Sequence, residues 1–281
     1  MDRYKGYYEV ILNEDEQAEI YSNEAVRADI IGAHCSLVEN CYYLVMDGKG
    51  ELVDTFCYQK STMRAVRFLT LGGNYTGVIK PRNPHQLLAF DMLKDTTSQI
   101  KLITGKFGTG KTLALVNGAL EMLERGKIDK IYWVRNNVQV KDTDPLGALP
   151  GDAHDKMLPY LGPFFDHAGG VEGVRRLIED DKLEVIPLGF LRGRSLRKSI
   201  VISSEAENLT KEQIQLLIGR IDEGSQLWID GDLKQRDRTI FEKSAGLETL
   251  IERLKNEELF AYVHLEKTER SAVAALADKL D

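Results

Sequence analysis

The sequence predicts an α/β protein in which a parallel sheet is covered by helices on both faces and preceded by a small β-rich domain. From about residue 98 onward, apolar strand-like segments alternate with helix-like segments, which is typical of a parallel sheet buried on both faces. Residues 1–78 lack this alternation and carry strand-forming residues separated by turn residues. Two prolines in residues 81–84 interrupt any regular element there. We therefore expect a small domain at residues 1–78 and a larger one at residues 79–281.

Composition narrows the class of protein. The chain has 281 residues and a net charge of −7, so its bulk charge gives no indication of nucleic-acid binding. No apolar run approaches the ~20 residues that a membrane-spanning helix needs, and the first ten residues lack the pattern of a signal peptide. The expectation is a soluble, cytoplasmic protein without a membrane partner.

The three cysteines, Cys35, Cys41 and Cys57, allow two interpretations. With His34 they could form a zinc site, although adjacent ligands at 34 and 35 fit a tetrahedral centre poorly. Because no two of them are spaced as C-x-x-C, buried free thiols in a reducing compartment are the simpler interpretation.

The individual elements follow from local pattern. In the N-terminal part, residues 7–12 and 41–46 are expected strands, residues 46–56 a hairpin with turn residues at Asp47, Gly48 and Gly50, and residues 71–77 a linker. In the larger part the expected strands are residues 99–105, 130–136, 182–190, 199–205, 225–232 and 260–266. The expected helices are residues 112–126, 171–181, a segment starting at Thr210 with the capping-box pattern T-K-E-Q, 244–256 and 269–280.

The strongest motif is GKFGTGKT, which fits the phosphate-binding pattern G-x-x-x-x-G-K-[ST] between an expected strand and an expected helix. Its residues are Gly105, Lys106, Phe107, Gly108, Thr109, Gly110, Lys111 and Thr112. Glycines let consecutive backbone N–H groups approach phosphate oxygens, and the helix N-terminus adds positive potential. In such loops the lysine reaches the β and γ phosphates and the hydroxyl binds Mg²⁺. We therefore expect nucleotide and Mg²⁺ binding here, with Lys111 also acting in catalysis.

Other strand ends should meet this loop, because ligands of open parallel sheets bind at the carboxyl ends of the strands. Ser204 and Glu205 follow one expected strand, and the acids Asp230 and Asp232 with Gln235 follow another. A third strand ends at Glu266, followed by Glu269 and Arg270. Glu205 is placed to act as general base for a water that attacks the γ phosphate, and Gln235 could hold that water or sense the phosphate.

Several segments together resemble the PhoH-like ATPases, whose core is similar to the first RecA-like domain of superfamily 1 helicases. They span about residues 80–277 and are PHQLLAFDML, GKFGTGKT, WVRNN, DPLGALPGDAHDKMLPYLGPFFD, GFLRGRSL, SSEAEN, LIGRIDEGSQLWIDGDLKQRD and EKTERSAVAAL. The resemblance implies a RecA-like P-loop domain that hydrolyses ATP with Mg²⁺. It also implies a link to RNA, here single-stranded RNA, and a homo-oligomeric ring, by family a hexamer.

The resemblance also implies roles for matching positions. Gln86 would contact adenine, Glu205 would be catalytic, Gln235 would sense the γ phosphate, and Thr112, Ser204 and Glu205 would lie at the metal. Arg270, together with Arg192 or Arg194, is a candidate arginine finger, which a neighbouring subunit of a ring would supply.

The chain departs from the family pattern in three places. Ser204 replaces an aspartate that normally holds a Mg²⁺-bound water, Glu207 replaces a glutamine, and Arg270-Ser271 replaces an Arg-His pair. A serine hydroxyl brings no charge, so weaker metal binding is expected. Asp230 stands where the family has a neutral residue, and we expect its strand to lie between the phosphate-loop strand and the Ser204 strand. Asp230 could compensate for the lost acid; the alternative is a solvated turn residue.

Two further functions stay open at this stage. Ser204 would also suit a non-hydrolysing ATP-dependent switch. Residues 192–198, RGRSLRK, could grip RNA phosphates, hold ATP across a subunit boundary, imitate the basic lid of a small-molecule kinase, or form a solvated connection.

Overall fold

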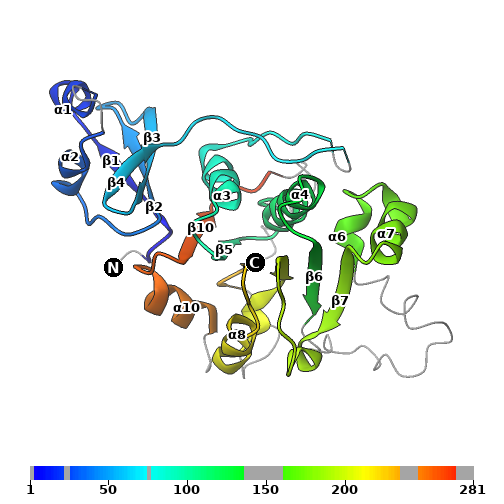
Figure 1. Cartoon of the computed structure of the whole chain (residues 1–281). Helices are drawn as coiled ribbons and strands as arrows, with labels where there is room; N and C mark the ends of the chain where they lie inside the picture. The colour runs from blue at the N-terminus through cyan, green and yellow to red at the C-terminus, as the bar shows by residue number, and fades with distance from the viewer. Residues whose placement is uncertain (1–2, 22–25, 75–76, 136–160, 235–245, 270–281) are drawn as a thin grey trace.

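The computed structural model describes residues 3–21, 26–74, 77–135, 161–234 and 246–269. These residues form two sheets (Figure 1), one of four strands in the order β1-β2-β3-β4 and one of six in the order β10-β5-β9-β8-β6-β7. All pairs in the larger sheet are parallel. The predicted α/β class, with a helix-covered parallel sheet and a small N-terminal β-sheet, is confirmed.

The larger sheet places the phosphate-binding motif beside the acidic strand ends. Its strands are β5 (Ile100–Gly105), β6 (Lys130–Arg135), β7 (Leu183–Pro187), β8 (Ser199–Ser203), β9 (Gln226–Gly231) and β10 (Phe260–Leu265). Strand β9 lies between β5 and β8, so Asp230 stands between the phosphate loop and Ser204, as the sequence predicts.

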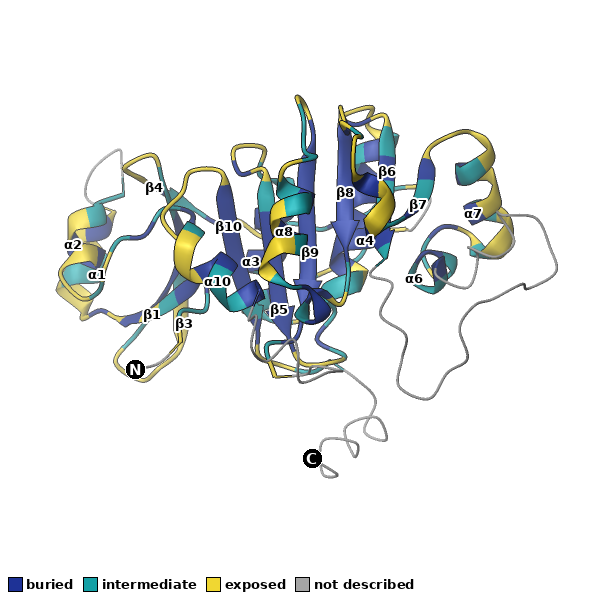
Figure 2. Cartoon of the chain, turned by 90° about the horizontal axis from the view of Figure 1, so that it is seen from below, coloured by how far each residue is buried: buried dark blue, intermediate teal, exposed yellow. Residues whose placement is uncertain are grey.

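Helices cover both faces of this sheet. Helices α3 (Pro84–Lys94) and α4 (Lys111–Glu124) lie on one face, and α8 (Lys211–Ile218) and α10 (Gly246–Leu254) lie on the other (Figure 2). The short helix α6 (Gly162–Phe165) and helix α7 (Gly170–Glu179) pack at the β6–β7 end on the α4 side. The strands are buried between these layers, which explains their continuously apolar sequences.

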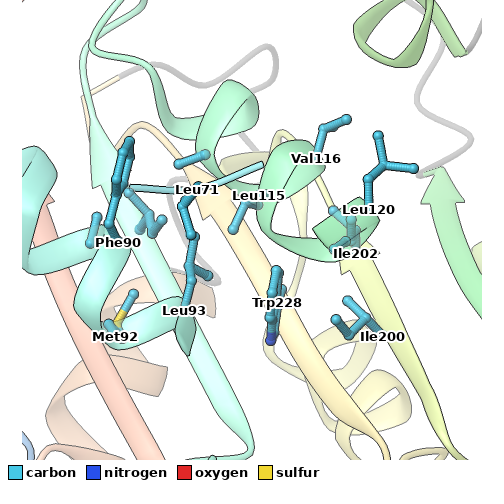
Figure 3. Packing of buried hydrophobic residues seen from close by; sticks show 14 of the residues in the cluster. Leu71, Phe90, Met92, Leu93, Leu115, Val116, Leu120, Ile200, Ile202 and Trp228 are labelled. Atoms are coloured by element: carbon cyan, nitrogen blue, oxygen red, sulfur yellow. The ribbon is translucent and has the colours of Figure 1, made fainter. Parts of the chain in front are cut away.

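Alternation along the strands divides the core into two clusters. Trp228, Ile200 and Ile202 pack with α3 and α4 (Figure 3), whereas their neighbours Leu227 and Ile229 pack with α8 and α10. Because side chains alternate along a strand, residues 204 and 230 fall on the same face as Ile202 and Trp228, toward α4.

Helix starts follow local capping chemistry. The predicted capping box is present, with the Thr210 side chain accepting from Gln213 and the Gln213 side chain accepting from the Thr210 backbone. Helix α3 was not predicted, and the sequence carried its signal: Asn83 caps the helix and Pro84 occupies its first turn. The predicted strand at residues 182–190 ends at Pro187, and the 3-10 turn η2 (Leu188–Leu191) follows. A second 3-10 turn, η3 (Ala206–Asn208), follows β8.

The smaller sheet contains β1 (Tyr7–Ile11), β2 (Cys41–Met46), β3 (Leu52–Gln59) and β4 (Thr62–Ala65). The predicted β2–β3 hairpin is confirmed, with Asp47 accepting from Gly50 in the turn. The sequence did not predict β4, which follows a turn with positive φ at Lys60 and Ser61. It also did not predict the helices α1 (Glu14–Ile20) and α2 (Ala28–Gly32), although Asn13 and Glu16 form a capping box for α1.

Polar contacts fix the smaller sheet to the larger one. The Asn40 side-chain amide donates to the carbonyls of Glu258 and Phe260, both at 2.9 Å. Arg64 and Tyr42 donate to the buried Asp91 of α3. Apolar residues of both sheets belong to one buried cluster, and Leu71 exchanges two backbone hydrogen bonds with Ile79. The division at residues 78 and 79 stays a prediction.

The cysteines of the N-terminal part are free thiols, with Cys41 and Cys57 buried. Burial raises the pKa of the Cys41 thiol to about 12. His34 bonds to Glu16 at 2.8 Å, and the described residues contain no group of three His, Cys, Asp or Glu side chains suited to a metal. The zinc interpretation thus finds no support in the described part of the chain. None of the described helices is long and apolar enough to cross a membrane.

Candidate nucleotide site

The phosphate-binding loop joins the carboxyl end of β5 to the first turn of α4. Gly105, Gly108 and Gly110 have φ angles of 153°, 82° and 92°, which favour glycine. A Cβ atom at Gly105 would lie 2.4 Å from the carbonyl oxygen of Leu265 on β10. The backbone and the neighbouring strand therefore both require glycine at the start of the loop.

The side chains of Lys111 and Thr109 bond to carbonyl oxygens of the loop itself. Lys111 Nζ donates to the carbonyl oxygens of Gly105 at 2.6 Å and Lys106 at 2.9 Å, so its ammonium group lies over the loop. The buried Thr109 hydroxyl donates to the same Lys106 carbonyl at 2.9 Å. Lys106 and Phe107 are exposed. A cationic group above glycine-supported N–H groups at a helix N-terminus fits the phosphates of a nucleotide.

Two segments hold the loop from outside. The side-chain amide of Gln86, in the first turn of α3, donates to the Thr109 carbonyl at 2.9 Å, and its oxygen accepts from the Arg82 N–H at 2.9 Å. The backbone N–H of Glu269 donates to the Gly108 carbonyl at 3.0 Å. Both ends of the Gln86 amide are thus engaged within the protein, and its contact with adenine stays a prediction.

Asp230, at the end of β9, joins the loop to the Ser204 strand. Its Oδ2 atom accepts from the Thr112 hydroxyl at 2.7 Å. Its Oδ1 atom accepts from the Ser204 hydroxyl at 2.8 Å and from the Glu205 N–H at 3.0 Å. The register that pairs Ser203 with Ile229 brings the next residues of the two strands level. Asp230 is 2% exposed, so the interpretation as a solvated turn residue is wrong.

Glu205 has an unusual backbone conformation. Its φ angle is 55°, in the left-handed region that costs a non-glycine residue roughly 1 kcal/mol. The hydrogen bond from its N–H to Asp230 and the following turn η3 hold it there. Its side chain is exposed at the carboxyl edge of the sheet. This places Glu205 on the same edge of the sheet as the phosphate loop, and its role as general base stays a prediction.

Glu207 is a further residue of the candidate site, and the sequence pattern predicts no role for it. Its Oε2 atom accepts the Asp232 N–H at 2.9 Å, which ties the end of β8 to the end of β9. Burial, together with the nearby charges of Asp230 and Glu205, raises the pKa of Glu207 to about 7. A glutamine at this position could accept the same bond without a charge.

The remaining predicted residues are not brought to the loop by the described structure. Gln235 and Arg270 lie outside the described residues. Residues 192–198 lead from η2 to the start of β8, so Lys198 lies at the opposite end of that strand from Ser204. Three of their four cations pair with acids: Arg194 with Glu184, Arg197 with Asp222, and Lys198 with Asp129. Arg192 is exposed and makes no ion pair with any described residue.

Comparison with known proteins matches most of the chain to one family. Residues 78–278 match the family model described as PhoH-like protein. Protein PhoH2 of Bacillus subtilis is 29% identical over 289 residues, which cover 99% of this chain and 64% of that protein. Protein PhoH2 of Mycolicibacterium smegmatis is 36% identical over 206 residues, covering 72% and 47%. Protein PhoH of Escherichia coli is 32% identical over 212 residues, covering 70% and 56%. The chain thus spans about half to two thirds of the length of these relatives.

Proposed function

Since the chain belongs to the family of PhoH-like proteins, we propose that it binds ATP with Mg²⁺ in the loop of residues 105–112 and hydrolyses the γ phosphate. The observation that carries the proposal is the junction of three strand ends. The Thr112 hydroxyl of the loop bonds to Asp230, and Asp230 bonds to Ser204 and to the backbone of Glu205. A phosphate loop, a buried carboxylate and an exposed carboxylate therefore meet at one edge of the sheet.

The residues of the chain suit the steps of hydrolysis. The loop N–H groups and Lys111 would bind the phosphates, and the Thr112 hydroxyl together with the Ser204–Glu205 strand end would hold the metal. Mg²⁺, when bound, supplies positive charge to the β and γ phosphate oxygens. The exposed Glu205 carboxylate accepts a hydrogen bond from the attacking water and orients it in line with the γ phosphate. Gln235 is proposed as the γ-phosphate sensor and Arg270 as a catalytic arginine.

Single-stranded RNA and a homo-oligomeric ring are proposed as partners on the strength of the family resemblance. The cluster at residues 192–198 adds little to the RNA proposal, because acids neutralise three of its four cations. Arg192 is the member of the cluster that is exposed without an ion pair to a described residue, and it supports an arginine offered to a neighbouring subunit.

The test is phosphate release from ATP with Mg²⁺, with and without single-stranded RNA. Wild type is compared with Lys111→Ala, Glu205→Gln and the control Glu212→Gln, which changes an exposed glutamate on α8. We expect turnover in wild type and the control, and a loss of about 10²–10⁴-fold in Glu205→Gln, the usual contribution of a general base. Equal turnover in wild type and Glu205→Gln would exclude the catalytic role of Glu205.

Ser204 supports a second candidate, a nucleotide-dependent switch that does not hydrolyse ATP. Such a protein would bind Mg-ATP, and Lys111→Ala would lose that binding, while wild type would release no phosphate. A small-molecule kinase is disfavoured because Arg194, Arg197 and Lys198 are already paired rather than poised as a lid. A screen of phosphate acceptors with radiolabelled ATP separates this activity from hydrolysis.

A further inference from the structure

Asp230 is a buried carboxylate that has no positively charged partner among the described residues. Asp230 is 2% exposed and accepts three hydrogen bonds, all from neutral donors: the hydroxyls of Thr112 and Ser204 and the N–H of Glu205. No lysine, arginine or histidine among the described residues forms an ion pair with it. Buried charges in proteins are paired with an opposite charge or coordinate metals, so a cation is the component that would complete this arrangement.

The location of the carboxylate indicates which cation. The Thr112 hydroxyl, which lies 2.7 Å from Asp230 Oδ2, is the group that phosphate loops present to Mg²⁺. Mg²⁺ prefers hard oxygen ligands, keeps several waters and is commonly anchored by one or two carboxylates beside substrate phosphates. Asp230 Oδ2 thus lies within hydrogen-bond distance of the hydroxyl that would bind Mg²⁺ together with the nucleotide.

We propose that Asp230, on β9, has taken over the metal-anchoring role of the acid that is missing at position 204 on β8, and that Ser204 orients the Asp230 carboxylate. This inference rests on the proposed binding of Mg-nucleotide but not on hydrolysis. Ser204 and Glu205 hold Oδ1 from one side, which leaves Oδ2 directed at Thr112. The serine is then a functional partner of a relocated acid rather than a damaged position.

The geometry also explains why both positions are not acidic. Ser204 Oγ lies 2.8 Å from Asp230 Oδ1, so a carboxylate at position 204 would place two negative oxygens at about hydrogen-bond distance. Two carboxylates that share a site in this way cannot both ionise easily, and one of them becomes protonated. Introducing an aspartate at position 204 in this chain should therefore weaken metal binding.

The experiment measures the dissociation constant for a non-hydrolysable, fluorescent ATP analogue with excess Mg²⁺ and with excess EDTA. The quantity compared is the ratio of the Kd in EDTA to the Kd in Mg²⁺, which is large when Mg²⁺ supports binding. We expect Asp230→Asn to reduce this ratio by about 10–100-fold, the usual cost of losing a group that supports a metal ligand. Ser204→Asp should also reduce it, and Ser204→Ala should reduce it less. The exchange variant, Ser204→Asp with Asp230→Ser, should recover most of the wild-type ratio.

The experiment includes a control variant, and two of its outcomes would contradict the inference. Asp222→Asn changes an acid that pairs with Arg197 away from the loop and should leave the ratio unchanged. Melting temperatures confirm that each variant is folded, and the isosteric Asp230→Asn and the exchange variant give two independent readings. An unchanged ratio in Asp230→Asn, or a ratio improved by Ser204→Asp alone, would overturn the inference. If wild type binds the analogue with this pattern but releases no phosphate, hydrolysis fails and the metal role of Asp230 stands.

Discussion

Arg64 on β4 and Asp91 on α3 form a bidentate ion pair that joins the smaller sheet to a helix of the larger sheet. The guanidinium nitrogens lie 2.9 and 2.6 Å from the two carboxylate oxygens of Asp91. Asp91 is buried, and Tyr42 of β2 donates to it at 3.0 Å. Helix α3 begins with the residues that hold the phosphate loop, so this pair connects the smaller sheet to the helix behind the nucleotide site.

Arg64→Ala should lower the free energy of unfolding by about 1–3 kcal/mol, because it leaves a buried carboxylate with the Tyr42 hydroxyl as its remaining side-chain donor. Denaturant unfolding measures the loss. The control is Arg27→Ala, which removes an arginine paired with Asp29 and Glu19 on the surface and should cost less than about 1 kcal/mol. Equal costs for the two variants would show that the Arg64 pair contributes no more than a surface pair.

Gly6→Ala should detach the N-terminal segment, residues 4–6, from β10. A Cβ atom at this position would lie 1.8 Å from the carbonyl oxygen of Tyr262, and the φ angle of Gly6 is 81°. The matched control is Gly50→Ala, at a φ angle of 80° with no heavy atom within 4 Å of its Cβ position. Both variants carry the same backbone strain, so the difference reports the clash alone. Hydrogen exchange of the β10 amides should accelerate in Gly6→Ala; unchanged exchange would contradict the close approach.

Lys101 should make stability depend on pH. Its buried ammonium donates to the carbonyls of Leu93 and Asp95 at the end of α3, and burial lowers the pKa of Lys101 to about 7 from 10.5. Between these values the unfolded chain binds the proton and the folded chain does not, so this lysine makes stability rise with pH from about 7 to 10.5. Below pH 7 the folded protein carries a buried charge, and the unfavourable contribution is largest there.

The variant Lys101→Met removes this contribution, so its melting temperature should gain on that of wild type as pH is lowered from 10 to 7. The two hydrogen bonds to α3 are lost at every pH, and therefore the slope is the quantity to compare, not the absolute temperature. Lys127→Met, at an exposed position, should keep the wild-type slope. A Lys101→Met slope identical to that of wild type would mean that the lysine titrates normally.

The two arginines nearest to η2 should respond differently to substitution. Arg194 donates to Glu184 at 2.7 Å, so Arg194→Ala should affect stability slightly, by about 1 kcal/mol or less. Arg192→Ala should leave stability unchanged and lower ATP turnover, by about 10³-fold if Arg192 serves as an arginine finger for a neighbouring subunit. Turnover is measured over a range of protein concentrations, with the exposed Arg175→Ala as control. Normal turnover in Arg192→Ala would exclude Arg192 from the site.

The sequence predicts the large sheet well, because each of its strands is a short apolar run with a helix-like segment beside it. The phosphate loop could be found for the same reason: strand, glycines and helix are contiguous in the chain. Helices α1, α2 and α3 were missed. Their apolar residues lack a clear period. The caps at Asn13 and Asn83 were the signals for α1 and α3, whereas α2 has no side-chain cap.

The chemistry of the site was harder to predict, because it depends on residues far apart in the sequence. That Asp230 accepts from both Ser204 and Thr112 follows from the register of β8, β9 and β5. Likewise, the partners that neutralise the RGRSLRK cluster include Asp129 and Glu184, which precede it by many residues. Local charge patterns cannot show such pairings, so a run of arginines and lysines overstated the available positive charge.

The course of residues 4–6, which precede β1, affects how copies of this protein can associate. Strand β10 is the outermost strand of the large sheet on its side, and the His264 N–H donates to the carbonyl of Lys5 at 2.9 Å. Residues 4–6 therefore lie along the outer edge of β10, whose unpaired backbone groups could otherwise pair with a strand of another molecule. A chain shortened by these residues would expose the unpaired edge of β10. We expect it to aggregate and precipitate rather than to assemble in an ordered way.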